Sequence, residues 1–239
     1  MIFDASMCLG HPQISGSHGV EEILRAMDGA GVERAAIQAF EVVQKFDWRE
    51  ANERVAQACQ AHPDRLVGWG SLNHYDGPDE VDHVAALGLN GVKIFTSWGF
   101  TPGTGLIERF YNPIAEKCRD QRLAFAIEHE GHMPTLGGAV YSDCIVADAF
   151  PERPVLMSRC WSWGFWPDYL AAMVECENLI LEVGVAPSSW IKKAVEEVGA
   201  DRIVLGSWWP EHDPGAVLSQ VRGLGLEPKD ENMILSGTA

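Results

Sequence analysis

Eight short apolar runs, separated by amphipathic stretches, are the feature of this sequence that most limits its fold. The runs are rich in aliphatic and β-branched residues, whereas the intervening stretches repeat apolar residues every three or four positions. This alternation is typical of βα units around a parallel sheet. The predicted strands are IFDASMC (2–8), ERAAIQAF (33–40), RLVGWGSL (65–72), NGVKIF (90–95), RLAFAIEH (122–129), RPVLMSR (153–159), NLILEVG (178–184) and DRIVLGS (201–207).

The number of units predicts an α/β fold, a (β/α)8 TIM barrel that forms a single domain over residues 1–239. A doubly wound sheet rarely needs so many equal units. Typical helical stretches are VEEILRAMDGAG (20–31), which stops at its glycines, and WREANERVAQACQAHP (48–63), which ends before its proline. Two ways to close the barrel stay open. Either residues 213–225 form the helix after the eighth strand, or a terminal helix is cut short at Ala239.

Charge and cysteine usage narrow the classes of partner. Eighteen basic against 34 acidic residues give a net charge of -16, which repels nucleic acid and anionic membrane surfaces. No apolar run reaches the roughly 18 residues of a membrane span, and the start lacks a basic signal region, so a cytoplasmic location is expected. The six dispersed cysteines predict reduced thiols rather than disulfides or a zinc knuckle. The oligomeric state stays open, a homodimer included.

Catalytic side chains of such barrels stand at the C-terminal ends of the strands and in the loops that follow. The candidate catalytic positions are therefore those at the predicted strand ends. They are occupied by Ser6, Met7 and Cys8, Gln38, Asn73 and His74, Phe95, Glu128 and His129, Ser158 and Arg159, and Trp208.

Several segments resemble the amidohydrolase superfamily, in the same order along the chain. FDASMCLG is similar to D-A-H-x-H-L-G, GVKIF to G-V-K-L-H, LAFAIEHEG to L-P-V-x-I-H-x-G, PVLMSRCW to P-V-I-L-A-H-x-G, and RIVLGSWWP to R-I-L-F-G-S-D-Y/W-P. The resemblance implies an enzyme that binds a divalent metal ion at the mouth of its barrel and hydrolyses a small molecule there.

The metal ligands of that family do not carry over to this sequence. The resemblance places the two histidines of strand one on Ser6 and Cys8, the later histidines on Glu128 and Arg159, and the aspartate on Trp208. Only the thiol and the carboxylate could donate to a metal, and a guanidinium would oppose it. We therefore expect no metal and no other cofactor. Because the flanking segments are intact, both an engineered active site and natural repurposing stay open.

The first hypothesis for the chemistry is ester hydrolysis by a cysteine nucleophile. Cys8 would attack as a thiolate, His74 or His129 would accept its proton, and backbone N–H groups or Arg159 would hold the oxyanion. The alternatives are a buried structural thiol and loop histidines bonded to water.

A second hypothesis uses Glu128 as a general base for a Kemp-type elimination. A carboxylate beside Phe95 would be poorly solvated, which strengthens it as a base. Trp208 would stack on an aromatic substrate and Ser6 would donate a hydrogen bond. The structural alternative is an ion pair between Glu128 and Arg159 in the space of the lost metal.

Two further features leave options open. Lys93 is either an imine-forming amine or a lysine paired with an acid. The segment 160–166, with Trp161 as a candidate substrate contact, is either a hydrophobic lid or packing between loop and barrel. A small, aromatic substrate fits both enzyme hypotheses, and an inert barrel that binds a flat apolar ligand is the non-enzymatic alternative.

Overall fold

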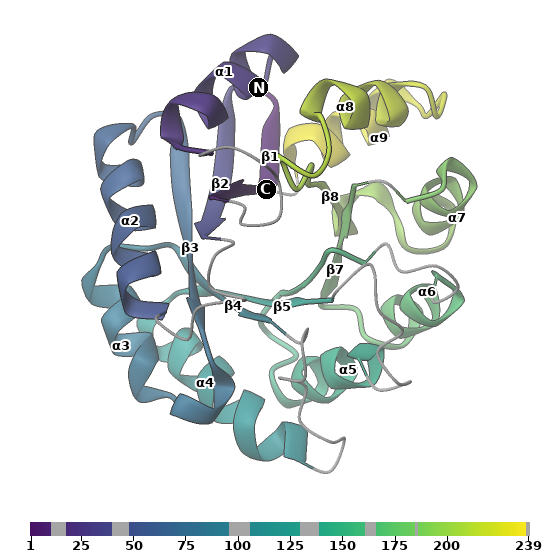
Figure 1. Cartoon of the computed structure of the whole chain (residues 1–239). Coiled ribbons are helices and arrows are strands. Elements are labelled where there is room, and N and C mark those ends of the chain that lie inside the picture. The colour runs from purple at the N-terminus through teal and green to yellow at the C-terminus, as the bar shows by residue number, and fades with distance from the viewer. Residues whose placement is uncertain are drawn as a thin grey trace.

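Eight parallel strands, hydrogen-bonded in the order of the chain, curl into a barrel with the helices outside it (Figure 1). The computed structural model describes residues 1–10, 18–39, 48–95, 106–129, 139–160, 166–184 and 186–237. Every predicted run contains a strand, so the predicted (β/α)8 barrel is confirmed. The strands are β1 (Phe3–Leu9), β2 (Arg34–Ala39), β3 (Leu66–Leu72), β4 (Gly91–Phe95), β5 (Ala124–Glu128), β6 (Val155–Ser158), β7 (Leu179–Val183) and β8 (Ile203–Leu205).

Backbone hydrogen bonds between β1 and the segment that follows β8 close the ring. The amide of Cys8 donates to the carbonyl of Trp209 at 2.7 Å, and the amide of Trp208 donates to the carbonyl of Ser6 at 2.7 Å. Residues near the two ends of the chain thus meet at one edge of the barrel mouth.

The helices follow the predicted amphipathic stretches. The first ends at Gly31, whose φ of 75° is a left-handed conformation that glycine adopts at little cost. Residues 213–225 contain the helix after β8, as the first option for closure predicted, and a further short helix follows it. Within the described segments, no helix has the length and apolar character needed to cross a membrane. The helices are α1 (Val20–Ala30), α2 (Trp48–Ala61), α3 (Asp79–Ala86), α4 (Ile107–Gln121), α5 (Ala139–Ala149), α6 (Trp166–Glu175), α7 (Ser188–Val198), α8 (Pro214–Arg222) and α9 (Pro228–Asn232).

The two ends of the barrel interior differ in chemistry. All eight strands contribute apolar residues to a cavity of about 260 Å³ at their N-terminal ends. The indole of Trp69 lines this cavity and packs on Gly91, where a Cβ would lie only 2.4 Å from the ring. The ammonium of Lys93 lies 5.2 Å from the same ring. Polar side chains gather on the C-terminal side of this tryptophan, at the end where barrel enzymes carry their chemistry.

Candidate active site

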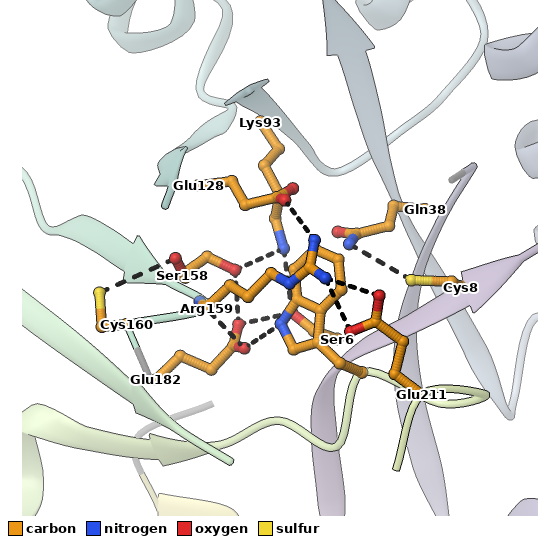
Figure 2. A network of polar contacts seen from close by, with 11 residues as sticks. Ser6, Cys8, Gln38, Lys93, Glu128, Ser158, Arg159, Cys160, Glu182 and Glu211 are labelled. Carbon is orange, nitrogen blue, oxygen red and sulfur yellow. Dashed lines mark hydrogen bonds and ion pairs between the residues drawn. The ribbon is translucent and has the colours of Figure 1, made fainter. Parts of the chain in front are cut away.

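A buried network of charged and hydroxyl side chains connects five strands of the barrel (Figure 2). The strand members are Ser6 of β1, Lys93 of β4, Glu128 of β5, Ser158 of β6 and Glu182 of β7. Three residues from the following loops complete it, namely Arg159, Trp208 and Glu211. The structure therefore brings together Ser6, Glu128, Arg159 and Trp208, four of the five residues that stand in the resemblance for metal ligands.

Glu182 is the centre of this network and was missed in the sequence. Its Oε2 accepts hydrogen bonds from Ser6 Oγ at 2.5 Å and Ser158 Oγ at 2.8 Å. Its Oε1 accepts from Trp208 Nε1 at 2.5 Å and from the backbone amide of residue 159 at 3.4 Å. A Cβ at Gly206 would lie 2.5 Å from this side chain, so glycine leaves room for it. A single acid inside the apolar run 178–184 was the available signal.

Lys93 lies inside the barrel between two hydroxyl groups and two indole rings. Its Nζ donates to Ser6 Oγ at 2.9 Å and to Ser158 Oγ at 3.0 Å. The same nitrogen lies 5.1 Å from the ring of Trp208. Burial lowers the pKa of Lys93, and the nearby Glu182 carboxylate opposes that shift. The expected pairing with an acid is thus indirect, because both serine hydroxyls stand between the two charges.

Arg159 joins two carboxylates across the barrel mouth. Its Nη2 donates to both oxygens of Glu211 at 2.6 and 2.7 Å, and its Nη1 donates to Glu128 Oε1 at 3.3 Å. The predicted ion pair between Glu128 and Arg159 is therefore present. The guanidinium lies 4.6 Å from the ring of Trp208. This indole contacts two cations of the protein itself, whereas we expected it to stack on a substrate.

Glu128 has the chemistry of an acid–base group. Its side chain is fully buried, with Phe95 and Ser158 beside it on the neighbouring strands. Burial raises the pKa of Glu128 to about 8, although the charges of Arg159 and Lys93 lower it in part. A carboxyl group of this pKa exchanges its proton near neutral pH, which suits it to general acid–base catalysis.

Cys8 has a different partner from the one that we expected. Its Sγ is buried and accepts a hydrogen bond from Gln38 Nε2 at 3.7 Å. Burial raises the pKa of the thiol well above its usual value, which disfavours the reactive thiolate. Among the described residues, no hydrogen bond joins this thiol to a histidine. The proposed dyad stays a prediction that this geometry does not support.

The two histidines proposed as bases for Cys8 contact other residues. His74 begins a short 3-10 turn after β3 and packs its ring against Tyr75 and Tyr111, with ring centroids 4.1 and 5.2 Å away. His129 Nε2 lies 2.8 Å from Asp143 Oδ2 of α5. Trp161, the remaining predicted contact, lies outside the described residues.

We predict that His74 makes the protein sensitive to acid. Burial lowers the pKa of His74 to about 4, so the folded state holds the ring neutral. The unfolded chain takes up this proton near its ordinary pKa of about 6.5. The resulting stabilisation is complete above that pH and is lost as the pH falls toward 4, a change of about 3 kcal/mol. Urea titrations of wild type and His74→Phe should diverge in this way between pH 7 and 4. A constant difference between the two proteins would contradict the prediction.

Comparison with known proteins places the barrel in a family. The sequence model of a family described as Amidohydrolase matches residues 11–239. The chain belongs to the amidohydrolase family. The match begins after β1, the strand on which two of the expected ligands are replaced. No curated protein matches the sequence.

Several solved structures share this barrel fold, although their sequences are only distantly similar to this chain. A 2,6-dihydroxybenzoate decarboxylase from Rhizobium has a TM-score of 0.74 at 15% identity, over 99% of this chain and 97% of its own. A dihydroxybenzoic acid decarboxylase from Polaromonas sp. with bound manganese has a TM-score of 0.71 at 13% identity, over 99% and 94%. A 4-oxalomesaconate hydratase from Rhodopseudomonas palustris has a TM-score of 0.72 at 15% identity, over 100% and 94%. At these identities the likeness concerns the fold.

The described residues of this chain do not fit a metal ion at the family's position. No group of three or more histidine, cysteine, aspartate or glutamate side chains within the described ranges could hold one. Arg159 and Trp208 offer no lone pair to a cation, and the thiol of Cys8 is held protonated by burial. Two protein cations, Lys93 and Arg159, stand in the same network. A divalent ion would meet their repulsion.

Two of these residues have an unusual backbone. Arg159 and Trp208 adopt φ values of 58° and 60°, in the left-handed region of backbone conformation that residues other than glycine seldom occupy. Such conformations persist where surrounding contacts enforce them, and they concentrate at functional sites. Here the hydrogen bonds to Glu182 and the ion pairs of Arg159 hold both residues toward the barrel axis.

Proposed function

We propose that this amidohydrolase is a metal-independent enzyme that moves a proton between Glu128 and a small organic anion. One observation carries the proposal. Glu128 is a fully buried carboxyl group at the C-terminal end of β5, with a pKa near 8 and a guanidinium 3.3 Å away. Structural carboxylates of ion pairs usually have a lowered pKa, so this raised value favours a role in proton transfer.

The surroundings of Glu128 support both directions of transfer. Its protonated form can donate to a carbon or oxygen atom, and its ionised form can accept a proton at slightly higher pH. Arg159 favours the carboxylate left after donation, as well as any negative charge that develops on a bound molecule. This acid–base pair needs no bound ion.

The guanidinium of Arg159 is the group of the mouth that suits an anionic substrate. It already binds the carboxylate of Glu211, so a substrate carboxylate would compete with Glu211 for it. The structural neighbours named above include decarboxylases of dihydroxybenzoates and a hydratase. Decarboxylation and hydration of a double bond each place a proton on carbon. We therefore extend the proposal to a flat, unsaturated carboxylate as substrate.

The cysteine esterase remains the weaker hypothesis. A nucleophilic thiol requires a base within hydrogen-bond reach, and Cys8 Sγ instead accepts from Gln38. The engineered origin considered for the pocket has no support in the structure.

A chelation experiment tests metal independence. We expect the base-promoted elimination of 5-nitrobenzisoxazole by the purified protein to be unchanged after dialysis against EDTA. Its rate should rise with pH through an inflection near 8, because the carboxylate is the active form and the pKa of Glu128 is about 8. A rate that disappears on chelation and returns with Mn²⁺ would overturn the proposal.

A further inference from the structure

The position of Lys93 allows an inference that does not depend on whether Glu128 is catalytic. Lys93 is the middle residue of β4, and its side chain is fully buried inside the barrel. It reaches hydroxyls of β1 and β6, two strands on which the family resemblance places metal ligands. The nitrogen thus stands among the positions from which a metal ion would be held.

The hydrogen bonds show how the charges are arranged. Each serine hydroxyl has one proton, and both Ser6 and Ser158 give theirs to Glu182 Oε2. Both oxygens must then accept from Lys93, whose nitrogen is the donor in each contact. An ammonium group supplies such donors, and two indole rings within 5.2 Å favour its positive charge.

The buried carboxylate of Glu182 needs the positive charge of the Lys93 ammonium. Its two oxygens accept four hydrogen bonds from hydroxyl, indole and backbone donors, so neither oxygen is left to carry a proton. None of these four donors bears a formal charge, and a buried carboxylate is costly without a compensating cation. Arg159 directs its guanidinium to Glu128 and Glu211. Lys93, one hydroxyl away from Glu182, is the compensating cation.

We propose that the Lys93 ammonium is the built-in cation that compensates the buried charge of Glu182 and thereby sets the geometry of this network. Lys93 is therefore a positioning residue. It holds Ser6, Ser158 and Glu182 in place, and through Glu182 it holds the indole of Trp208.

Chemical rescue tests this role directly. Lys93→Ala removes three methylene groups and the ammonium, a shape that n-propylammonium reproduces. We expect the variant to lose on the order of 10 °C in melting temperature, as for a broken buried pair. Millimolar n-propylammonium chloride should restore most of this loss, whereas n-propanol, of the same size without charge, should not. Wild type serves as the control and should respond to neither additive.

Other variants keep the test decisive if Lys93→Ala does not fold alone. Its yield of folded protein on refolding from urea should then depend on n-propylammonium and not on n-propanol. Lys93→Met keeps an apolar stem without charge and should be destabilised, while adding Glu182→Gln should recover part of the loss. Equal rescue by the alcohol, or a Lys93→Met protein as stable as wild type, would overturn the proposal.

Discussion

Glu128→Gln is expected to lower the rate of 5-nitrobenzisoxazole elimination by a factor of about 10² to 10⁴, the usual contribution of a positioned general base. Glutamine keeps the size of the side chain and removes its ionisation. The inflection near pH 8 should disappear with the rate, because both arise from the same carboxyl group. Steady-state rates across pH 6 to 10 measure both effects, and circular dichroism checks that the variant is folded.

Two matched variants show whether the loss is specific. Glu21→Gln makes the same chemical change on the exposed face of α1 and should leave the rate unchanged. Cys8→Ala separates the two enzyme hypotheses, since it should preserve the elimination. A Cys8→Ala protein that loses a burst with 4-nitrophenyl acetate, together with an unimpaired Glu128→Gln protein, would instead favour the cysteine esterase.

Arg159→Met is expected to lower the free energy of unfolding by about 3–5 kcal/mol, since it leaves the largely buried Glu211 carboxylate without its cation and Glu128 without its hydrogen bond. The Arg159 side chain is 3% exposed and contacts Glu128 and Glu211, which are themselves 0% and 11% exposed. Methionine keeps an unbranched stem, so the change isolates the charge and its hydrogen bonds. Urea unfolding at pH 7 measures the difference.

A surface pair provides the comparison for this variant. Arg25 is 68% exposed and pairs with Glu22 at 3.0 Å on α1. Arg25→Met should cost less than about 1 kcal/mol, as is usual for exposed ion pairs. If both variants lose the same small amount, the network at the barrel mouth does not stabilise the fold as we describe.

The order of the strands could be predicted from the sequence because each strand is a short apolar run. The meeting of Ser6, Glu128, Arg159 and Trp208 followed from the same information, since side chains at the ends of parallel strands share one mouth. Glu182, which accepts a hydrogen bond from Ser6, was not predicted, although the strand that carries it was.

The partners of individual side chains could not be predicted in this way. Cys8 lies near the end of β1 and His74 follows β3, yet the thiol contacts Gln38 and the imidazole packs among aromatic rings. His129 faces Asp143, which comes from a helix on the outside of the barrel. Such choices depend on side-chain direction and on packing against helices, which a pattern of apolar residues does not encode.

The left-handed backbone at Arg159 and Trp208 bears on how this mouth could have changed. Histidine and aspartate, which the family resemblance places at these two positions, enter that conformation several times more readily than most other residues. The backbone at these two positions thus has a shape that suits the family's pair better than the present one. Arg159→His and Trp208→Asp together would relax the backbone, but they would also remove the cation that binds Glu211 and the indole that donates to Glu182. The strained conformation is therefore retained because the contacts of these two side chains outweigh its cost.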